Sequence, residues 1–369
     1  MDLFNKKERA SAEVVVQDVV KVKKGERVLI IANPETSEIA QDLFTACSEA
    51  GALSTLMYQP SKTSFDNANP EVLAAIASNP DVCFSISNIK LGKDPSGAAN
   101  PYKTEDGHEY THIFDYLIDG KKTMRGAWTP GLTTEMMNRT APIDYKELQE
   151  RCSKLGEYFE DVVSVHVTSP GGTDLIVPVD GRKLMFDDGD FSKPGLGGNI
   201  PAGEVFISPV VGGSQGTIVY DGSMTFSDGD SIIETPIVCN VENGFVSDIK
   251  GGAEAKRLLK TITEAETRAL AYEKDGKLPE GQGAVYKKNA RNIGELGIGL
   301  NPSARITGNM LEDEKAFRTC HFAIGENYDN DAPSLIHLDG VVREPTIVLT
   351  YRDGKERTIL NEGELQIED

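Results

Sequence analysis

The stretch VLIIANPETSEIAQDLFTACSEAGALSTLMY, residues 28–58, contains the pattern that decides the fold of the first part of the chain. It opens with an apolar run at 28–32, which is typical of a strand buried on both faces. Asn33-Pro34 ends this strand, and a segment with apolar residues at helical spacing follows as far as Gly51. Residues 53–58 then have the composition of a second strand. The order strand, helix, strand predicts a parallel pair with a right-handed crossover.

The same alternation continues beyond this unit. The chain shows a short helix at 70–78 and a third apolar strand at 82–86, which extends the parallel sheet. Sheets of this kind often bind nucleotides, but the first strand runs into the sequence ANPET at 32–36 rather than a GxGxxG loop. Glu35 would also lie where a phosphate needs a helix N-terminus. Nucleotide binding is therefore not expected here.

The pattern changes after the third strand. Residues 89–130 are rich in Gly, Pro, Lys and Asp, and we interpret them as a long surface excursion with a short element at 112–118. From 162 onward short alternating strands and Asp-Gly or Asn-Gly turns prevail, interrupted by a helix near 253–273.

These patterns define the expected domains and fold class. We expect an α/β N-terminal domain with a parallel sheet at 1–160, followed at 161–369 by a β-rich α+β domain.

Composition limits the function. Lys plus Arg number 38 and Asp plus Glu 58, so the net charge of −20 argues against nucleic-acid or anionic-membrane partners. No apolar run approaches the roughly 20 residues of a membrane span, and the N-terminus lacks the apolar core of a signal peptide. The five cysteines are scattered without a CxxC spacing. We expect a reduced, cytoplasmic protein.

The histidines provide the strongest chemical signal. His337 and Asp339 are two positions apart, so on a strand they face the same side and can share one metal ion. His321 lies sixteen positions upstream, and only five histidines occur in the whole chain. A surface pair at 337–339 and a hydrogen-bonded core histidine at 321 are the alternatives.

Two glutamates lie in apolar surroundings framed by glycine or proline, Glu204 and Glu295. A buried carboxylate is costly unless it is paired or bound to a metal, so we expect the two to lie near each other, although a sheet edge or a salt bridge would also accommodate either. Together with the two histidines and Asp339, they can hold two divalent ions, as in co-catalytic hydrolases, while one ion would leave ligands to spare.

At this point the sequence resembles the metallo-aminopeptidase family of aminopeptidase T and aminopeptidase S. The shared segments occur in the family's order: PGGTDL at 170–175, PAGEVF at 201–206, GE at 294–295, HFAIGENY at 321–328 and HLD at 337–339. The likeness is clear over about 162–345, and over the N-terminal domain it is limited to the order of the elements.

The resemblance implies a cytoplasmic, homodimeric metallo-aminopeptidase that acts on short peptides. It implies two divalent ions (zinc, cobalt, manganese or magnesium) bound by Glu204, Glu295, His321, His337 and Asp339. Tyr328 would donate to the tetrahedral oxyanion, and either Glu204 or Glu295 would act as general base.

Some features depart from the family pattern. The acidic run Asp313-Glu314-Lys315 lies farther from His321 than the corresponding DEN element does, and the gap between Tyr328 and His337 is shorter.

A shorter related branch resembles the iron-dependent 2,5-dihydroxypyridine ring-cleaving dioxygenases, which need two histidines and one carboxylate. His321, His337 and Asp339 can supply such a site. A catalytically inactive metal-binding relative is the third possibility.

Overall fold

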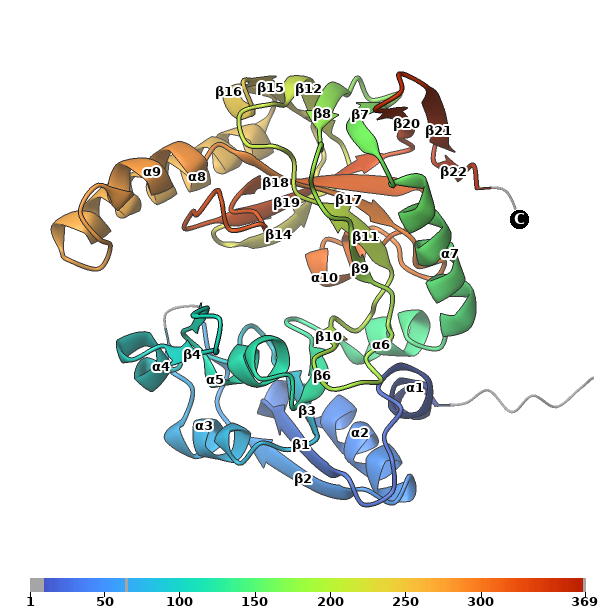
Figure 1. Ribbon diagram of the computed structural model, residues 1–369, viewed down its shortest axis with the longest axis vertical. Helices are drawn as coiled ribbons and strands as arrows, with labels where there is room; N and C mark the ends of the chain where they lie inside the picture. The colour runs from blue at the N-terminus through green and yellow to red at the C-terminus, as the bar shows by residue number, and fades with distance from the viewer. Residues whose placement is uncertain (1–9, 64–65, 368–369) are drawn as a thin grey trace, which may run out of the picture. The chain divides into compact units, whose positions relative to one another are not determined.

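The structure, a computed structural model, describes residues 10–63 and 66–367 (Figure 1). Its contacts divide the chain into two compact units. Unit 1 comprises Met1–Gln149 and Asp187–Ala202, and unit 2 comprises Glu150–Phe186 and Gly203–Asp369.

This division differs in two ways from a single boundary at residue 160. It falls within helix α7, Tyr145–Tyr158. It also returns residues 187–202 to unit 1, because strand β10 (Gly197–Gly198) pairs in parallel with β6 (Arg125–Trp128).

Unit 1 is built on a parallel sheet of five strands in the order β10-β6-β3-β1-β2. The three strands expected from sequence form its centre and one edge: β1 Arg27–Ala32, β2 Leu53–Tyr58 and β3 Val82–Ile86. Val28 lies opposite both Ser54 and Val82, so β1 pairs on both sides. The expected helices are α2, Ser37–Glu49, and α3, Pro70–Ala77. The predicted parallel α/β fold is confirmed.

The interpretation of 89–130 as a surface excursion was wrong at its end, because β6 lies inside the sheet next to β3. Its sequence RGAW did not predict a buried strand, because it contains a charged residue and a glycine. Arg125 is buried, but its guanidinium binds the Glu26 carboxylate at 2.7 Å and two backbone carbonyls. Gly126 lies so close to β3 that a Cβ atom there would come within 1.9 Å of the Cys83 carbonyl oxygen.

Unit 2 is the expected β-rich domain, with two antiparallel sheets. One sheet has eight strands in the order β16-β15-β12-β8-β7-β20-β21-β22: Phe245–Lys250, Ile237–Glu242, Gln215–Tyr220, Asp174–Pro178, Val162–Thr168, Thr346–Tyr351, Glu356–Asn361 and Glu364–Leu365. The other has seven strands in the order β14-β13-β19-β18-β17-β11-β9: Gly229–Ile232, Ser223–Phe226, His337–Arg343, Thr319–Gly325, Ile293–Gly299, Glu204–Ile207 and Met185–Asp187.

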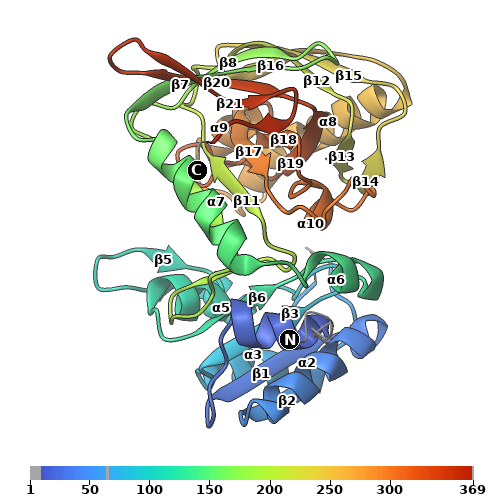
Figure 2. The ribbon, with the colours of Figure 1, turned by 90° about the vertical axis from the view of Figure 1, so that its right-hand side faces the viewer.

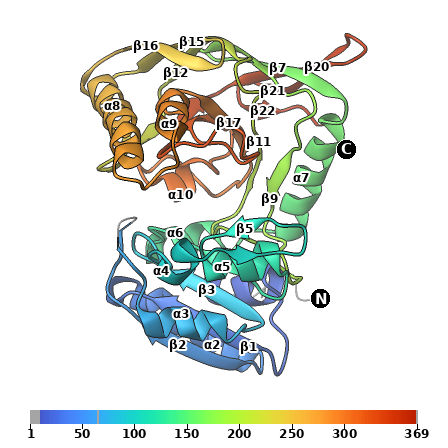
Figure 3. The same ribbon diagram turned by 60° about the vertical axis from the view of Figure 1, so that its left-hand side comes forward.

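The predicted long helix is α8, Ala253–Lys274, and it lies beside α9, Gln282–Asn289 (Figure 3). The buried positions of α8 recur at helical spacing and include Leu258, Ile262 and Ala265.

In the part of the chain that the structure describes, no helix combines the length and apolar character needed to cross a bilayer.

Candidate metal centre

The candidate site lies on one face of the seven-stranded sheet, where β11, β17, β18 and β19 run side by side (Figure 2). All seven residues of β17 and all seven of β18 are buried. In the ladder Glu295 lies opposite Ala323, which in turn lies opposite Asp339. Side chains opposite each other on neighbouring strands point to the same face. The register therefore places two carboxylates, separated by one small residue, on the same face.

A glycine on this face makes room for the His321 ring. Gly297 lies opposite His321 on the neighbouring strand. A Cβ atom on Gly297 would come within 2.1 Å of both Cε1 and Nε2 of the His321 ring. Gly297, in the run GELGIG, therefore allows an imidazole to lie across the neighbouring strand.

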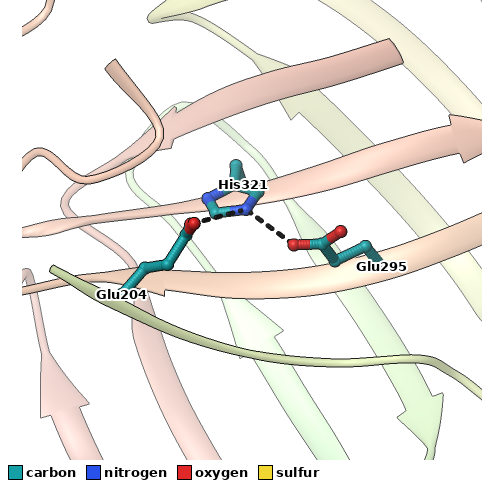
Figure 4. A group of neighbouring side chains, drawn as sticks. All are labelled: Glu204, Glu295 and His321. Carbon is teal, nitrogen blue, oxygen red and sulfur yellow. Dashed lines mark hydrogen bonds and ion pairs between the residues drawn. The ribbon is translucent and has the colours of Figure 1, made fainter. Parts of the chain in front are cut away.

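One group of possible ligands surrounds His321 (Figure 4). Its Nε2 lies 3.1 Å from Oε1 of Glu295 and 3.5 Å from Oε2 of Glu204. The three side chains offer ligand atoms that all lie within 4.8 Å of one another. The prediction that Glu204 and Glu295 lie near each other is confirmed, although 91 positions separate them in the sequence.

A second group of possible ligands shares Glu295 with the first and adds His337 and Asp339. The Nε2 atom of His337 lies 3.3 Å from Oε2 of Glu295 and 3.2 Å from Oδ1 of Asp339. The Nδ1 atom of His337 lies 2.9 Å from the Glu326 carbonyl oxygen. A neutral ring donates a hydrogen bond from its Nδ1–H to that oxygen. Such an outer hydrogen bond orients an imidazole so that its Nε2 lone pair points at a metal.

Burial and charge show that these residues fit a divalent cation. Glu204, Glu295 and His321 are 6%, 4% and 1% exposed. Carboxylate oxygens and imidazole lone pairs that face one another repel unless a proton or a metal ion lies between them. The structure therefore supports a metal site here.

Without a metal ion, the negative charges of the cluster favour protonation of its histidines. Burial by itself lowers the pKa of His321, but the hydrogen bond with Glu295 and the negative charges of Glu204 and Asp339 outweigh it and raise that pKa to about 9. The same balance raises the pKa of His337, with Asp339 as the main partner. Burial by itself raises the pKa of Asp339, but the charge and hydrogen bond of His337 outweigh this effect and lower the pKa to about 2.

These shifts predict how the stability of the chelated protein depends on pH. Because His321 has a higher pKa in the folded state than in the unfolded chain, its proton stabilises the fold fully below about pH 6.5. This contribution is lost as the pH rises through about 9. We expect the free energy of unfolding to fall by up to about 3 kcal/mol between these values, at roughly 1.4 kcal/mol per pKa unit. Urea unfolding of the chelated protein at several pH values measures this change in the free energy of unfolding.

The matched control for this prediction is His321→Gln, which removes one titrating group and should make the pH dependence shallower, while His337, whose pKa is also raised, still contributes. Saturation with a divalent ion should flatten it too, because the ion replaces the proton. An equal pH dependence in the native protein and the His321→Gln variant would contradict the assignment.

Two further groups of the site were not predicted. Lys315 is fully buried, and its ammonium lies 3.0 Å from Oε1 of Glu204 and also contacts the Glu314 carboxylate. Both residues follow the short helix α10, Met310–Asp313. In the sequence, Asp313-Glu314-Lys315 stands out only as a counterpart of the family's DEN element, and its charged composition did not predict that Lys315 is buried and Glu314 largely shielded from water.

Aromatic side chains border the candidate centre. The Tyr328 ring packs against the His337 ring with centroids 5.3 Å apart and against Phe206 at 5.1 Å. Tyr328 is 53% exposed, so its ring forms an accessible edge beside His337. The position is compatible with the predicted role as an active-site phenol.

The remaining three histidines lie elsewhere. His166 pairs with Asp174 on the surface, His112 accepts the Phe114 backbone N–H, and His108 packs on Tyr110. None of them belongs to either group of possible ligands among the described residues.

Comparison with known proteins identifies the family. A sequence model of the family described as 2,5-dihydroxypyridine 5,6-dioxygenase matches residues 133–366. The chain belongs to this family. The 2,5-dihydroxypyridine 5,6-dioxygenase of Pseudomonas putida is 27% identical over 134 residues, which are 36% of this chain and 38% of that protein. The match therefore spans well under half of the length of the curated relative.

Two solved structures share the fold of this dioxygenase-family chain. The 2,5-dihydroxypyridine dioxygenase of P. putida KT2440 aligns with a TM-score of 0.70 and 18% identity, over 97% of this chain and 96% of the other. AmpT from Thermus thermophilus aligns with a TM-score of 0.64 and 18% identity, over 96% and 98%.

The similarity to AmpT supports the fold that the aminopeptidase resemblance implied. The expectation that the chain is a hydrolase was wrong, because the family model and the curated relative both name an oxidoreductase. The shared fold explains the error, since one scaffold can carry different reactions.

Proposed function

We propose that this chain is a ring-cleaving dioxygenase that acts on a small dihydroxylated aromatic or pyridine compound and uses one ferrous ion. The supporting observation is the convergence of two imidazole Nε2 atoms, from His321 and His337, on the shared carboxylate of Glu295, with Asp339 beside His337. Two histidines and one carboxylate, with open positions, suit non-haem iron that reacts with oxygen.

Each residue of the centre has a distinct part in this proposal. His321, His337 and Asp339 would hold the ion, and Glu295, whose carboxylate lies within 3.3 Å of both Nε2 atoms, would be a further oxygen ligand. A ferrous ion held there supplies the activation of molecular oxygen. The hydrogen bond from His337 Nδ1 to the Glu326 carbonyl oxygen keeps the Nε2 lone pair directed into the site.

The aromatic edge beside the centre suits a flat substrate. Tyr328 and Phe206 pack together next to His337, and a planar ring can stack on such a surface. The partly exposed Tyr328 leaves this edge reachable. Its hydroxyl is a hydrogen-bond donor suited to a phenolate oxygen of the substrate. A dihydroxylated ring therefore matches the surface in shape and in polarity.

The proposal is tested by reconstituting the chelated protein with ferrous ion under nitrogen and then adding oxygen and 2,5-dihydroxypyridine. We expect one molecule of oxygen to be consumed for each molecule of 2,5-dihydroxypyridine lost, as followed by the absorbance of the ring. Both atoms of labelled oxygen should appear in the ring-opened product. Zinc should occupy the site without supporting turnover, because it has no accessible redox change.

The matched control is Asp339→Asn, which keeps the shape of the side chain but removes its charge and should abolish the iron-dependent reaction. Ring loss that continues without oxygen would contradict the proposal. Bound iron with no turnover of any dihydroxylated ring would favour an inactive metal-binding relative instead.

A further inference from the structure

Lys315 holds an unusual position for a lysine. Its side chain is 0% exposed, and its ammonium lies within the acidic cluster rather than at its edge. Oε1 of Glu204 accepts a hydrogen bond from the ammonium at 3.0 Å, while Oε2 of the same carboxylate lies 3.5 Å from Nε2 of His321. Glu314 accepts a second hydrogen bond from the same ammonium. A fixed positive charge therefore lies one carboxylate away from the possible metal ligands.

An ammonium in this environment is costly to bury unless carboxylates compensate it. Glu204 and Glu314 provide that compensation, and both are themselves shielded from water, with side chains 8% and 15% exposed. The contact also has a consequence for metal binding. A carboxylate oxygen that accepts a strong hydrogen bond from an ammonium is a poorer ligand for a second cation, because both charges compete for the same lone pairs.

The charge balance points the same way. Glu204, Glu295, Glu314 and Asp339 carry four formal negative charges and Lys315 one positive charge, so the cluster sums to −4 + 1 = −3. One divalent ion reduces this to −1, whereas two would make it positive. Without Lys315, two divalent ions would balance the four carboxylates. The lysine thus supplies part of the positive charge that a second ion would otherwise bring.

We propose that Lys315 is a built-in cation that occupies the place of a second metal ion and restricts the centre to a single one. It does so by engaging Glu204 and Glu314, which leaves the group of Glu295, His337 and Asp339 for the metal, with His321 beside Glu295. The inference deepens the proposed function, since it rests on a metal centre in these residues. It makes Lys315 a residue that decides metal number rather than one that touches substrate.

The experiment compares metal loading of native protein and Lys315→Gln with manganese, which is stable in air. After saturation and gel filtration, we expect about one manganese per native chain and about two per variant chain. Two manganese ions roughly 4 Å apart are magnetically coupled, so the paramagnetic resonance spectrum of the variant should change with the second ion. Lys250→Gln, on the surface with the lysine 69% exposed, is the matched control and should bind like the native protein.

Two outcomes would overturn the inference: native protein that binds two ions at saturation, or a folded Lys315→Gln variant that still binds one. Should this variant fail to fold even with manganese present, Glu204→Gln decides. It keeps the lysine and removes the negative charge of a residue that, by this inference, is not a ligand, so loading should stay near one ion. Loss of that ion from Glu204→Gln would contradict the inference.

The readout separates this inference from the proposed reaction. One ion in the native protein and two in Lys315→Gln would support the role of Lys315 even if no dihydroxylated ring is cleaved. Ring cleavage by a native protein that binds two ions would support the reaction and refute the role of Lys315.

Discussion

Replacement of His337 by alanine should remove most of the bound metal and abolish metal-dependent turnover. His337 is the residue whose ring is held from outside by the Glu326 carbonyl while its Nε2 faces two carboxylates. Loss of an outer hydrogen bond alone costs 10–100-fold in metal affinity, so loss of the ligand itself should cost more than about 100-fold. Elemental analysis after equilibrium dialysis against ferrous or manganese ion measures the change.

The control for His337→Ala is His166→Asn, which alters a surface histidine paired with Asp174 and should leave the metal content unchanged. A fully loaded His337→Ala variant would mean that the ion is bound by the group around His321 alone. Asp339 would then have no part in holding the metal, and the assignment of the HLD segment would be wrong.

Gly297→Ala is expected to weaken metal binding as well, although it replaces none of the proposed ligands. The added methyl group would lie 2.1 Å from two atoms of the His321 ring, so the ring must leave its position between Glu204 and Glu295. Overpacking of a buried strand costs about 1–3 kcal/mol of stability. We expect that loss, together with at least a roughly 10-fold weaker metal affinity, since even outer-shell disturbances have this effect.

The matched control is Gly156→Ala in helix α7, where the same methyl group would meet the ring of Phe186 at 2.7 Å. Phe186 is 45% exposed and can turn away, so metal affinity should not change. Thermal unfolding and metal titration of both variants distinguish a positional effect from general destabilisation. Unchanged metal affinity in Gly297→Ala would show that the ring of His321 need not lie where the structure places it.

The error in enzyme class has a chemical origin. The short segments around Glu204, Glu295, His321 and His337 specify donor atoms, and the same donors suit a hydrolytic or an oxygen-activating metal. The segments therefore predicted a metal site and a fold, but they did not distinguish between two reactions. Lys315, which we propose limits the number of metal ions, lies in the run Asp313-Glu314-Lys315, and the sequence of that run does not show which carboxylates the lysine contacts.

The amino-acid sequence by itself determined the features that depend on neighbouring residues. The apolar run at 28–32 and the helix after it predicted the parallel sheet, because period and turn chemistry act over a few positions. The two-residue spacing of His337 and Asp339 placed both on one strand face for the same reason. The apolar frames of Glu204 and Glu295 predicted that the two carboxylates would meet, because each needs a partner when buried.

Only the tertiary structure decided the features that depend on which strands become neighbours. Glu295 touches both histidines because antiparallel pairing of β17, β18 and β19 sets its register, and one residue of slip would turn it to the other face. Arg125 enters the first sheet because Glu26, 99 positions away, neutralises it. Lys315 reaches Glu204 across 111 positions. Pairing over such distances follows from the folded backbone, since no local pattern of residues encodes which buried charges will meet.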